Sequence, residues 1–315
     1  MLYNLFFNNF TPVQAAAIGV ICTFILTFIT LNMRFSFLPE DKGRAFAVDG
    51  ALSRGKLRGV GIVFVVDFII ASVLFLPLSA ELIIYLLLIF FVMLSGYLDD
   101  AAEKPWNEYK KGLIDLALSL GTMVTFLSQN DSKVSVLGFE VLLPYPVYFI
   151  LGVALIWCAI NVTNCADGVD GLSATLVIIT IMSFVLIFTE DLGSMGLFGE
   201  LFVATLLAYL CFNTYPSSML MGDAGSRAMG FLIAIIAMKS HHPFAYLILS
   251  LVLILDGGLG LLKVSLIRFL KIHIMKNIRT PIHDHVRKNM EWSGPQVVVR
   301  FAIAQIIFSV LYAMF

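Results

Sequence analysis

Long apolar runs dominate this chain and set the first limit on its fold. The runs extend for about 16 to 25 residues, and a helix that crosses a bilayer needs about 20 apolar residues. Hydrophobic residues make up 60% of the 315 positions, and charged residues only 13%. An ordinary soluble domain carries about 25% charged residues. The composition therefore excludes a soluble globular protein and predicts an all-α, polytopic membrane protein.

The apolar runs predict about ten membrane-spanning helices joined by short loops, within one integral membrane domain that covers residues 1–315. The ten runs are residues 14–33, 59–78, 82–98, 112–128, 146–162, 172–189, 197–213, 227–240, 244–270 and 297–315. The ninth run is too long for one upright helix, and we expect a break at Asp256-Gly257-Gly258 because paired glycines kink helices. The first run has no basic segment before it, so we expect a retained span and not a cleaved signal peptide.

Lys and Arg are distributed unevenly among the loops. If the N-terminus lies outside, each of the twenty basic residues except Lys133 and Lys239 falls in or beside a cytoplasmic loop. Because cytoplasmic loops concentrate Lys and Arg, this pattern predicts both termini on the extracytoplasmic side. The net charge of −1 gives no indication of a nucleic-acid partner. The four cysteines lie in apolar runs without paired spacing, which favours buried thiols over disulfides or a zinc site.

Four polar clusters interrupt the apolar pattern, and the predicted topology places all of them on the cytoplasmic face. They are Asp99-Asp100, residues 161–171, Gly222-Asp223-Ala224-Gly225-Ser226 and Pro281-Ile282-His283-Asp284-His285. Carboxylate and amide oxygens suit Mg²⁺, with Mn²⁺ as the alternative, and basic side chains bind phosphate oxygens. Two histidines without a nearby cysteine do not make a zinc site. We expect these clusters to form a solvated site for metal-assisted phosphoryl transfer.

Each cluster taken alone also has a simpler explanation. The Asp99-Asp100 pair could be a solvated helix end, Asp223 a helix cap, and the two histidines could lie at the lipid headgroups. The basic loops could simply attract anionic lipid. The polar run 164–170 is harder to explain in this way, because a dense polar segment between two spans is costly unless it serves a water-filled cavity.

Three further acids lie inside predicted spans, where carboxylates are functional candidates. We expect Asp115 to cap its helix or to pair with Lys111, and Asp256 to face a cavity. Asp67 has no evident role, and neither Asp67 nor Asp256 has an evident partner in the sequence.

In their order along the chain, the clusters resemble the polyprenyl-phosphate N-acetylhexosamine-1-phosphate transferases, and within them the branch that acts on muramoyl-pentapeptides. The resemblance covers the chain from about residue 95 to the C-terminus. It rests on Leu98-Asp99-Asp100, residues 161–172, Phe212-Asn213, residues 221–226, residues 281–285 and residues 294–301.

The resemblance implies a reaction and its partners. UDP-N-acetylmuramoyl-pentapeptide and undecaprenyl phosphate would give lipid I and UMP for peptidoglycan synthesis, with Mg²⁺ required. The enzyme would be a multi-pass protein of the bacterial inner (cytoplasmic) membrane, in contact with membrane lipid. Its active site would face the cytoplasm, and a homodimer is one expected assembly.

The resemblance also implies roles for individual residues. Asp99 matches the proposed base or nucleophile and Asp100 its essential neighbour, while His283 and His285 match histidines near the substrate phosphates. Asp223 matches the metal-binding aspartate. The residues expected to bind substrate are Lys110, Lys111, Asn161, Asn164, Asp167, Asp170 and Arg279, of which Asp170 is expected at the uracil.

Three departures from the pattern leave more than one interpretation open. Asp284 replaces the middle histidine of a triplet, which keeps transfer of N-acetylglucosamine-1-phosphate or a related sugar as an alternative. The loop after Asp100 is short, so either Lys110 or Lys111 could contact phosphate. The loop 34–58 matches poorly, and Arg54 or Lys56 fills its basic position. A secondary transporter and a non-catalytic homologue also stay open as interpretations of the chain.

Overall fold

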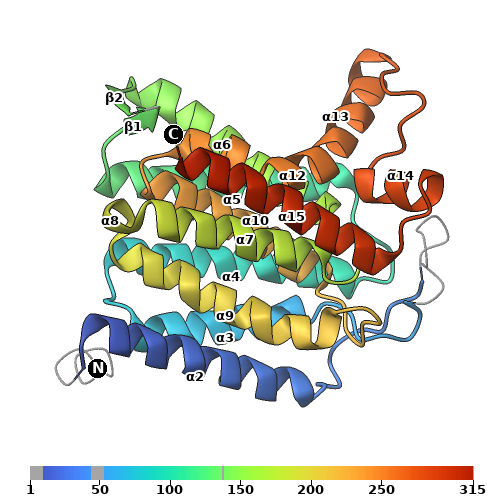
Figure 1. The fold of residues 1–315 in the computed structure, drawn as a ribbon, viewed down its shortest axis with the longest axis horizontal. Coiled ribbons are helices and arrows are strands. Elements are labelled where there is room, and N and C mark those ends of the chain that lie inside the picture. The colour runs from blue at the N-terminus through green and yellow to red at the C-terminus, as the bar shows by residue number, and fades with distance from the viewer. Residues whose placement is uncertain (1–9, 44–52, 137, 315) are drawn as a thin grey trace.

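The structure, a computed structural model, describes residues 10–43, 53–136 and 138–314, and helices form most of it (Figure 1). The long helices are α2 (Pro12–Asn32), α3 (Gly61–Phe75), α4 (Ala80–Asp100), α5 (Glu108–Gln129), α6 (Tyr145–Cys165), α7 (Leu172–Ile187), α9 (Ser194–Asn213), α10 (Gly222–Lys239) and α15 (Gly294–Ala313). The shorter helical elements are α8 (Thr189–Leu192), η1 (Pro243–Ala245), α11 (Tyr246–Leu249), α12 (Leu251–Leu253), η2 (Ile254–Gly258), α13 (Leu259–Ser265), η3 (Leu266–Leu270) and α14 (Ile282–Asn289). The all-α fold class predicted from the sequence is confirmed.

Each of the ten predicted runs forms helix, but the count of ten spans is not confirmed. Within the described residues, six helices are long and apolar enough to cross a membrane, or seven if one bent pair counts as a span. The helices α3 and α7 are apolar but only 15 and 16 residues long. The six or seven long apolar helices make the chain a multi-pass membrane protein.

The predicted break in the ninth run is present, although it lies a few residues earlier than expected. The segments Pro243–Leu249 and Leu251–Leu270 meet at an angle of 71°. The amide side chain of Gln305 in α15 satisfies the backbone at this bend, accepting from Val252 N at 2.9 Å and donating to Leu249 O at 2.8 Å. The residues Asp256-Gly257-Gly258, expected to break the helix, instead continue it as a π-helical turn.

The helix α10 is the centre of the bundle, because it is buried from Gly222 to Met238 and packs against α3, α4, α6 and α7. Two glycines allow this close packing. A Cβ atom on Gly61 of α3 or on Gly96 of α4 would clash with the backbone of α10 at Gly225 and Asp223. The close approach fixes the first turn of α10 beside the ends of α3 and α4.

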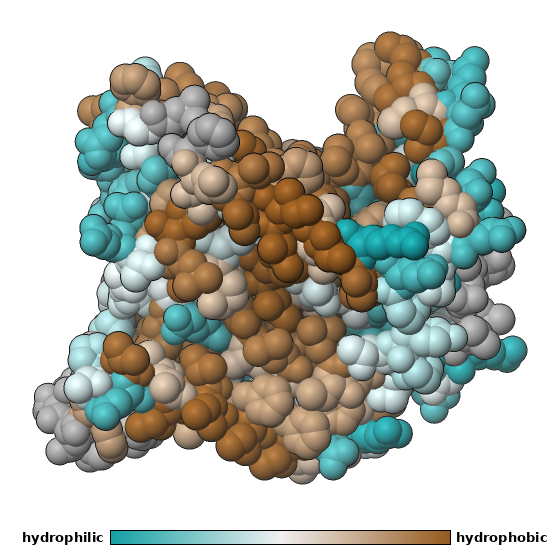
Figure 2. Space-filling view, in the orientation of Figure 1, coloured by the Kyte–Doolittle hydropathy of each residue, from teal (hydrophilic) through white to brown (hydrophobic). Residues whose placement is uncertain are grey.

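Two ends of the bundle carry the polar residues, and an apolar belt lies between them (Figure 2). The loops that follow α2, α4, α6 and α9 lie at the right-hand end in Figure 1, together with α14. At the opposite end, an unexpected hairpin pairs β1 (Lys133–Val136) with β2 (Phe139–Leu142). The start of α2 and the end of α15 also lie there, while their side of the membrane stays a prediction.

Candidate active site

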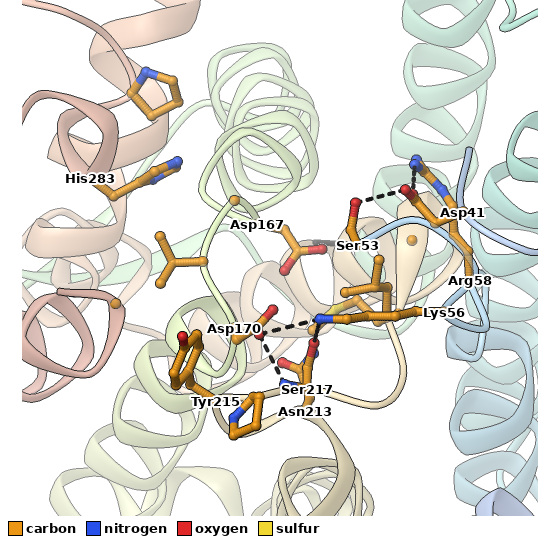
Figure 3. A pocket seen from close by; sticks show the side chains of 18 of the residues that line it. Asp41, Ser53, Lys56, Arg58, Asp167, Asp170, Asn213, Tyr215, Ser217 and His283 are labelled. Carbon is orange, nitrogen blue, oxygen red and sulfur yellow. Dashed lines mark hydrogen bonds and ion pairs between the residues drawn. The ribbon is translucent and has the colours of Figure 1, made fainter. Parts of the chain in front are cut away.

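A cavity of about 660 Å³ opens among the loops at the right-hand end of the bundle in Figure 1. Its walls come from the loop before α3, the end of α6 and the turn after it, the segment between α9 and α10, and α14. Figure 3 shows several of the lining side chains from close by. The predicted site residues in its wall are Asn164, Asp167, Asp170 and His283.

Asp170 and Lys56 lie next to each other in the wall of the cavity, with their charged groups directed toward each other (Figure 3). The Asp170 carboxylate accepts a hydrogen bond from Ser217 N at 3.0 Å and lies 3.7 Å from Lys56 Nζ. Lys56 Nζ in turn donates to Ser217 Oγ at 2.9 Å. This triangle places a carboxylate, an ammonium and a hydroxyl group within reach of one bound molecule.

Asn213 at the end of α9 fixes the turn that carries these acids. Its Oδ1 accepts from Gly171 N at 2.9 Å, and its Nδ2 donates to Met219 O at 2.8 Å. Gly171 has a φ of +80°, which favours glycine at this position. The Ser173 hydroxyl donates to Asp167 at 2.6 Å, so the start of α7 holds the second acid.

A carboxylate–cation network lies beside the cavity and joins α4, α5 and α10. It consists of Asp99, Asp100, Asp223, Lys111 and Arg58. Lys111 Nζ forms an ion pair with Asp99 and lies 3.1 Å from Asp223 Oδ2. Arg58 Nε donates to Asp100 Oδ1 at 2.8 Å, and its Nη2 lies 3.8 Å from Asp223 Oδ1. Three of the predicted acids, far apart in the sequence, therefore converge around two cations.

Arg58 connects this network to the cavity, because its side chain lines the cavity wall (Figure 3). Its Nη1 also donates to Asp41 Oδ2 at 3.0 Å. Burial alone would lower the pKa of Arg58, but the charge of Asp100 and bonds to both acids raise it above its usual value. Burial would raise the pKa of Asp41, yet hydrogen bonds from Ser53, Gly43 and Arg58 lower it overall. Both groups are therefore held in their charged forms.

The network offers oxygen ligands that suit a hard divalent cation. Within the part of the chain that the structure describes, no three His, Cys, Asp or Glu side chains form a ready-made metal cluster. Mg²⁺ does not need one, since it commonly takes one or two carboxylates together with substrate phosphates. Asp223 is only 8% exposed, so the expectation of a solvated aspartate is wrong. Its carboxylate lies beside the side chain of Asn164. This donor set fits Mg²⁺ or Mn²⁺.

His283 and Asp256 form a buried pair at the far wall of the cavity. Asp256 Oδ1 accepts from His283 N at 2.7 Å, and its Oδ2 lies 2.8 Å from His283 Nδ1. The sequence predicts that Asp256 faces a cavity and shows no partner for it; in the structure it is 1% exposed, does not line this cavity and has His283 as its partner. Asp67, the other acid for which the sequence shows no partner, accepts a hydrogen bond from the Thr30 hydroxyl at 2.5 Å.

Four predicted site residues lie neither in the cavity wall nor in the carboxylate–cation network. Lys110 Nζ lies 3.3 Å from the centre of the Trp106 ring. Arg279 is exposed, and its backbone N donates to His285 Nδ1 at 3.3 Å. Asn161 donates to Asp115 at 3.3 Å inside the bundle. The roles of these residues stay predictions.

Asp115 was expected to cap its helix or to pair with Lys111, and this expectation is wrong. It forms an ion pair with Arg227, which lies one turn after Asp223 on α10. Arg227 is only 1% exposed, so the pair is deep in the bundle. Sequence spacing could not reveal a contact between residues 112 positions apart.

Some cavity residues were missed by the sequence analysis. The sequence alone does not single out Arg58 or Asp41, and it does not decide between Arg54 and Lys56. Lys56 lines the cavity, whereas Arg54 is exposed. A local signal is present in the sequence: Gly55 and Gly59 flank Lys56 and Arg58. These two glycines have φ values of +82° and +72°.

Known proteins are similar to this chain over most of its length. The sequence pattern of glycosyl transferase family 4 matches residues 82–241. The phospho-N-acetylmuramoyl-pentapeptide-transferase of Treponema pallidum (strain Nichols) is 37% identical over 328 aligned positions, which cover 96% of this chain and 90% of the relative. The protein of the same name from Symbiobacterium thermophilum is 30% identical, with 80% and 79% covered. That of Latilactobacillus sakei subsp. sakei is 27% identical, with 92% and 95% covered.

Proposed function

This chain belongs to glycosyl transferase family 4, and from that membership we propose that it transfers phospho-N-acetylmuramoyl-pentapeptide from its UDP derivative to undecaprenyl phosphate. The products are lipid I and UMP. One observation carries the proposal: Asp99, Asp100 and Asp223 meet Lys111 and Arg58 beside a cavity that has charged side chains in its wall and is large enough for a nucleotide.

The reaction is a displacement at phosphorus. An oxygen of the acceptor phosphate attacks the phosphorus next to the sugar, the bond from that phosphorus to UMP breaks, and UMP leaves with the electron pair. A phosphate monoester has a second pKa of about 6, so the acceptor is mostly dianionic at neutral pH. A base at Asp99 therefore contributes little, and we favour a single displacement over an aspartyl-phosphate intermediate.

The main task of the site is to bring anionic groups together. Lys111 and Arg58 hold fixed positive charge where the two phosphates meet, which lowers the repulsion that would block attack. Asp223 would hold Mg²⁺, or alternatively Mn²⁺, which when bound supplies further charge neutralisation. Lys56 is in a position to bind the nucleotide phosphates, and Asp170 to accept from the uracil.

The membrane fold has a part in this function. The apolar helices let the lipid tail of the acceptor remain in the bilayer while its phosphate reaches the cavity. We infer that the cavity faces the cytoplasm of a bacterium, because the basic loops lie at that end of the bundle. The loop before α3, in the first half of the chain, and helices of the second half both supply cavity residues, which supports residues 1–315 acting as one unit.

A transporter is less well supported than this transferase. Transporters place their ion sites near the bilayer midplane. The acids that motivated this alternative are Asp67 and Asp256, and each accepts a hydrogen bond from a neighbouring residue, Thr30 or His283. The larger group of acids lies at one end of the bundle.

A product assay tests the proposal. The purified protein in detergent is incubated with undecaprenyl phosphate, Mg²⁺ and either UDP-N-acetylmuramoyl-pentapeptide or UDP-N-acetylglucosamine, and lipid products are identified by mass spectrometry. We expect lipid I from the first donor only. A product from N-acetylglucosamine alone would change the assigned substrate, and no product from either donor would contradict the proposed function.

A matched pair of variants tests the site. Asp223→Asn should abolish transfer, whereas the same change at Asp131, in an exposed loop at the opposite end, should leave transfer unchanged. Full activity of Asp223→Asn would exclude Asp223 as the metal ligand.

A further inference from the structure

The buried carboxylate of Asp256 has no part in the proposed binding of substrate or metal. Asp256 is 1% exposed, and both of its oxygens contact one residue, His283. One oxygen accepts the backbone N–H and the other faces Nδ1 of the ring. An isolated carboxylate is costly to bury in a membrane protein, so a carboxylate in this position indicates a function.

Close packing on α6 fixes the position of Asp256. It lies in the π-helical turn η2, and π-helical turns frequently mark functional sites. The next residue, Gly257, packs so closely on Val162 of α6 that a Cβ atom there would clash with the carbonyl oxygen. The turn cannot move without displacing α6, which leads directly into the cavity wall.

The other ring nitrogen of His283 faces the cavity. His283 is 3% exposed, and in Figure 3 its ring points toward the part of the cavity where Asp167 lies. A Cβ atom on Gly168 would clash with Nε2, so this nitrogen lies directly beside the turn that carries Asp167 and Asp170. Asp256 and the cavity therefore contact opposite edges of one imidazole ring.

We propose that Asp256 is a positioning residue, which holds the His283 ring protonated with Nε2 directed into the cavity, where Nε2–H donates to a phosphate oxygen of the bound nucleotide sugar. This inference rests on the proposed function for the identity of the phosphate. A carboxylate that accepts from one nitrogen of an imidazole fixes its orientation and leaves the opposite nitrogen as the donor.

The charged groups around the ring favour this arrangement. Asp256 faces it from η2, Asp284 and Arg287 lie on its own helix α14, and Asp167 and Asp170 line the same cavity from the turn after α6. Burial lowers the pKa of His283, but the charge and hydrogen bond of Asp256 outweigh burial and raise the pKa above its usual value. The charge of Asp284 adds to this rise, and that of Arg287 opposes it. The net effect favours the imidazolium form.

The first test is the pH dependence of transfer. In the wild-type protein, kcat/KM should fall at alkaline pH as His283 loses its proton. Asp256→Asn keeps the size of the side chain but removes the charge, so this alkaline limb should move to lower pH and kcat/KM at neutral pH should fall about 10- to 100-fold. Asp256→Glu keeps the charge and should keep the limb near its wild-type position, even if the rate falls.

Two further variants separate positioning from folding. In the His283→Gln background, Asp256→Asn should cause little additional loss, because its partner is already absent; a full additional loss would overturn the proposal. Asp67→Asn removes another buried carboxylate, bonded to Thr30 and remote from the cavity, and should leave the pH profile unchanged. If Asp256→Asn does not fold, His283→Gln alone provides the test. The fall in kcat/KM at alkaline pH should then disappear, and a fall at the wild-type pH in His283→Gln would overturn the proposal.

A measurement without turnover distinguishes this inference from the proposed function. The chain has five histidines, so the ring signal of His283 can be assigned by NMR from its loss in His283→Gln. Its titration midpoint should fall in Asp256→Asn and not in Asp67→Asn. A lowered midpoint in a protein that makes no lipid I would contradict only the proposed function. An unchanged midpoint in an active protein would contradict the role of Asp256.

Discussion

Arg58 Nε lies 2.8 Å from Asp100 Oδ1, and this contact fastens the loop before α3 to the end of α4. The Asp100 side chain is fully buried, whereas that of Arg58 is 20% exposed at the cavity wall. The same guanidinium also bonds Asp41 and approaches Asp223. One cation therefore both compensates a buried charge and presents positive charge to the site.

Removal of Arg58 should cost both stability and activity. Arg58→Ala leaves the buried Asp100 without its counter-ion, and we expect a loss of about 3 kcal/mol, the lower end for a broken buried pair because Arg58 is partly exposed. Arg58→Lys should recover only part of this loss, since one ammonium cannot reproduce the forked contacts of a guanidinium. Denaturation in detergent, followed alongside transfer activity, measures both effects. Arg54→Ala, at an exposed site, is the control, and equal stability of the two alanine variants would contradict this account.

The adjacent lysines Lys110 and Lys111 should respond differently to replacement by alanine. Lys111 forms ion pairs with Asp99 and Asp223, while Lys110 stacks on Trp106 away from the cavity. We expect Lys111→Ala to lower kcat by at least about 100-fold, the loss typical for an electrostatic group at a reacting centre. Lys110→Ala should remain within a few-fold of wild type. Steady-state kinetics decide the question, and equal tolerance of both changes would remove Lys111 from the site.

The sequence was sufficient to predict the class of fold and which polar clusters converge. Polar segments between apolar runs must lie at a membrane surface, and the basic loops assign them to one face. Asp99, Asp100 and Asp223 could therefore be grouped from the amino-acid sequence alone. The motif order also carried the resemblance to a family that the comparisons support.

The partners of individual side chains could not be predicted in the same way. Asp115 bonds Arg227 and not the nearby Lys111, because helix packing and not sequence spacing decides which side chains meet. The bend near residue 250 depends on Gln305, a residue from another helix. The count of ten spans is not confirmed for a related reason, since packing shapes the helices: α3 and α7 are short, and α10 is buried by its neighbours and carries charges that a lipid-facing helix would avoid.

The pH dependence of stability should report the bond between His283 and Asp256. Burial lowers the pKa of His283, yet the charge and hydrogen bond of Asp256 raise it above the usual 6.5. A histidine whose pKa is higher in the folded state contributes stability that is fully present below pH 6.5 and lost as pH rises through the folded value. Thermal denaturation of wild type and Asp256→Asn from about pH 6 to pH 9 measures this contribution. The gap between them should narrow as pH rises, and a constant gap would show that the bond carries no linked proton.

The buried pair of Asp115 and Arg227 tests how much the free energy of unfolding depends on an ion pair in the core. Two nitrogens of Arg227, Nε and Nη1, have no hydrogen-bond partner among the described residues, so the guanidinium is incompletely satisfied. Removing one member leaves an uncompensated buried charge, and Asp115→Leu or Arg227→Met should each cost about 3 to 5 kcal/mol. The double variant should recover most of this loss, because a well-packed apolar pair is often as stable as a buried ion pair. A double-mutant cycle from denaturation in detergent measures the coupling free energy. Simple additivity of the two losses would show that the charges do not depend on each other.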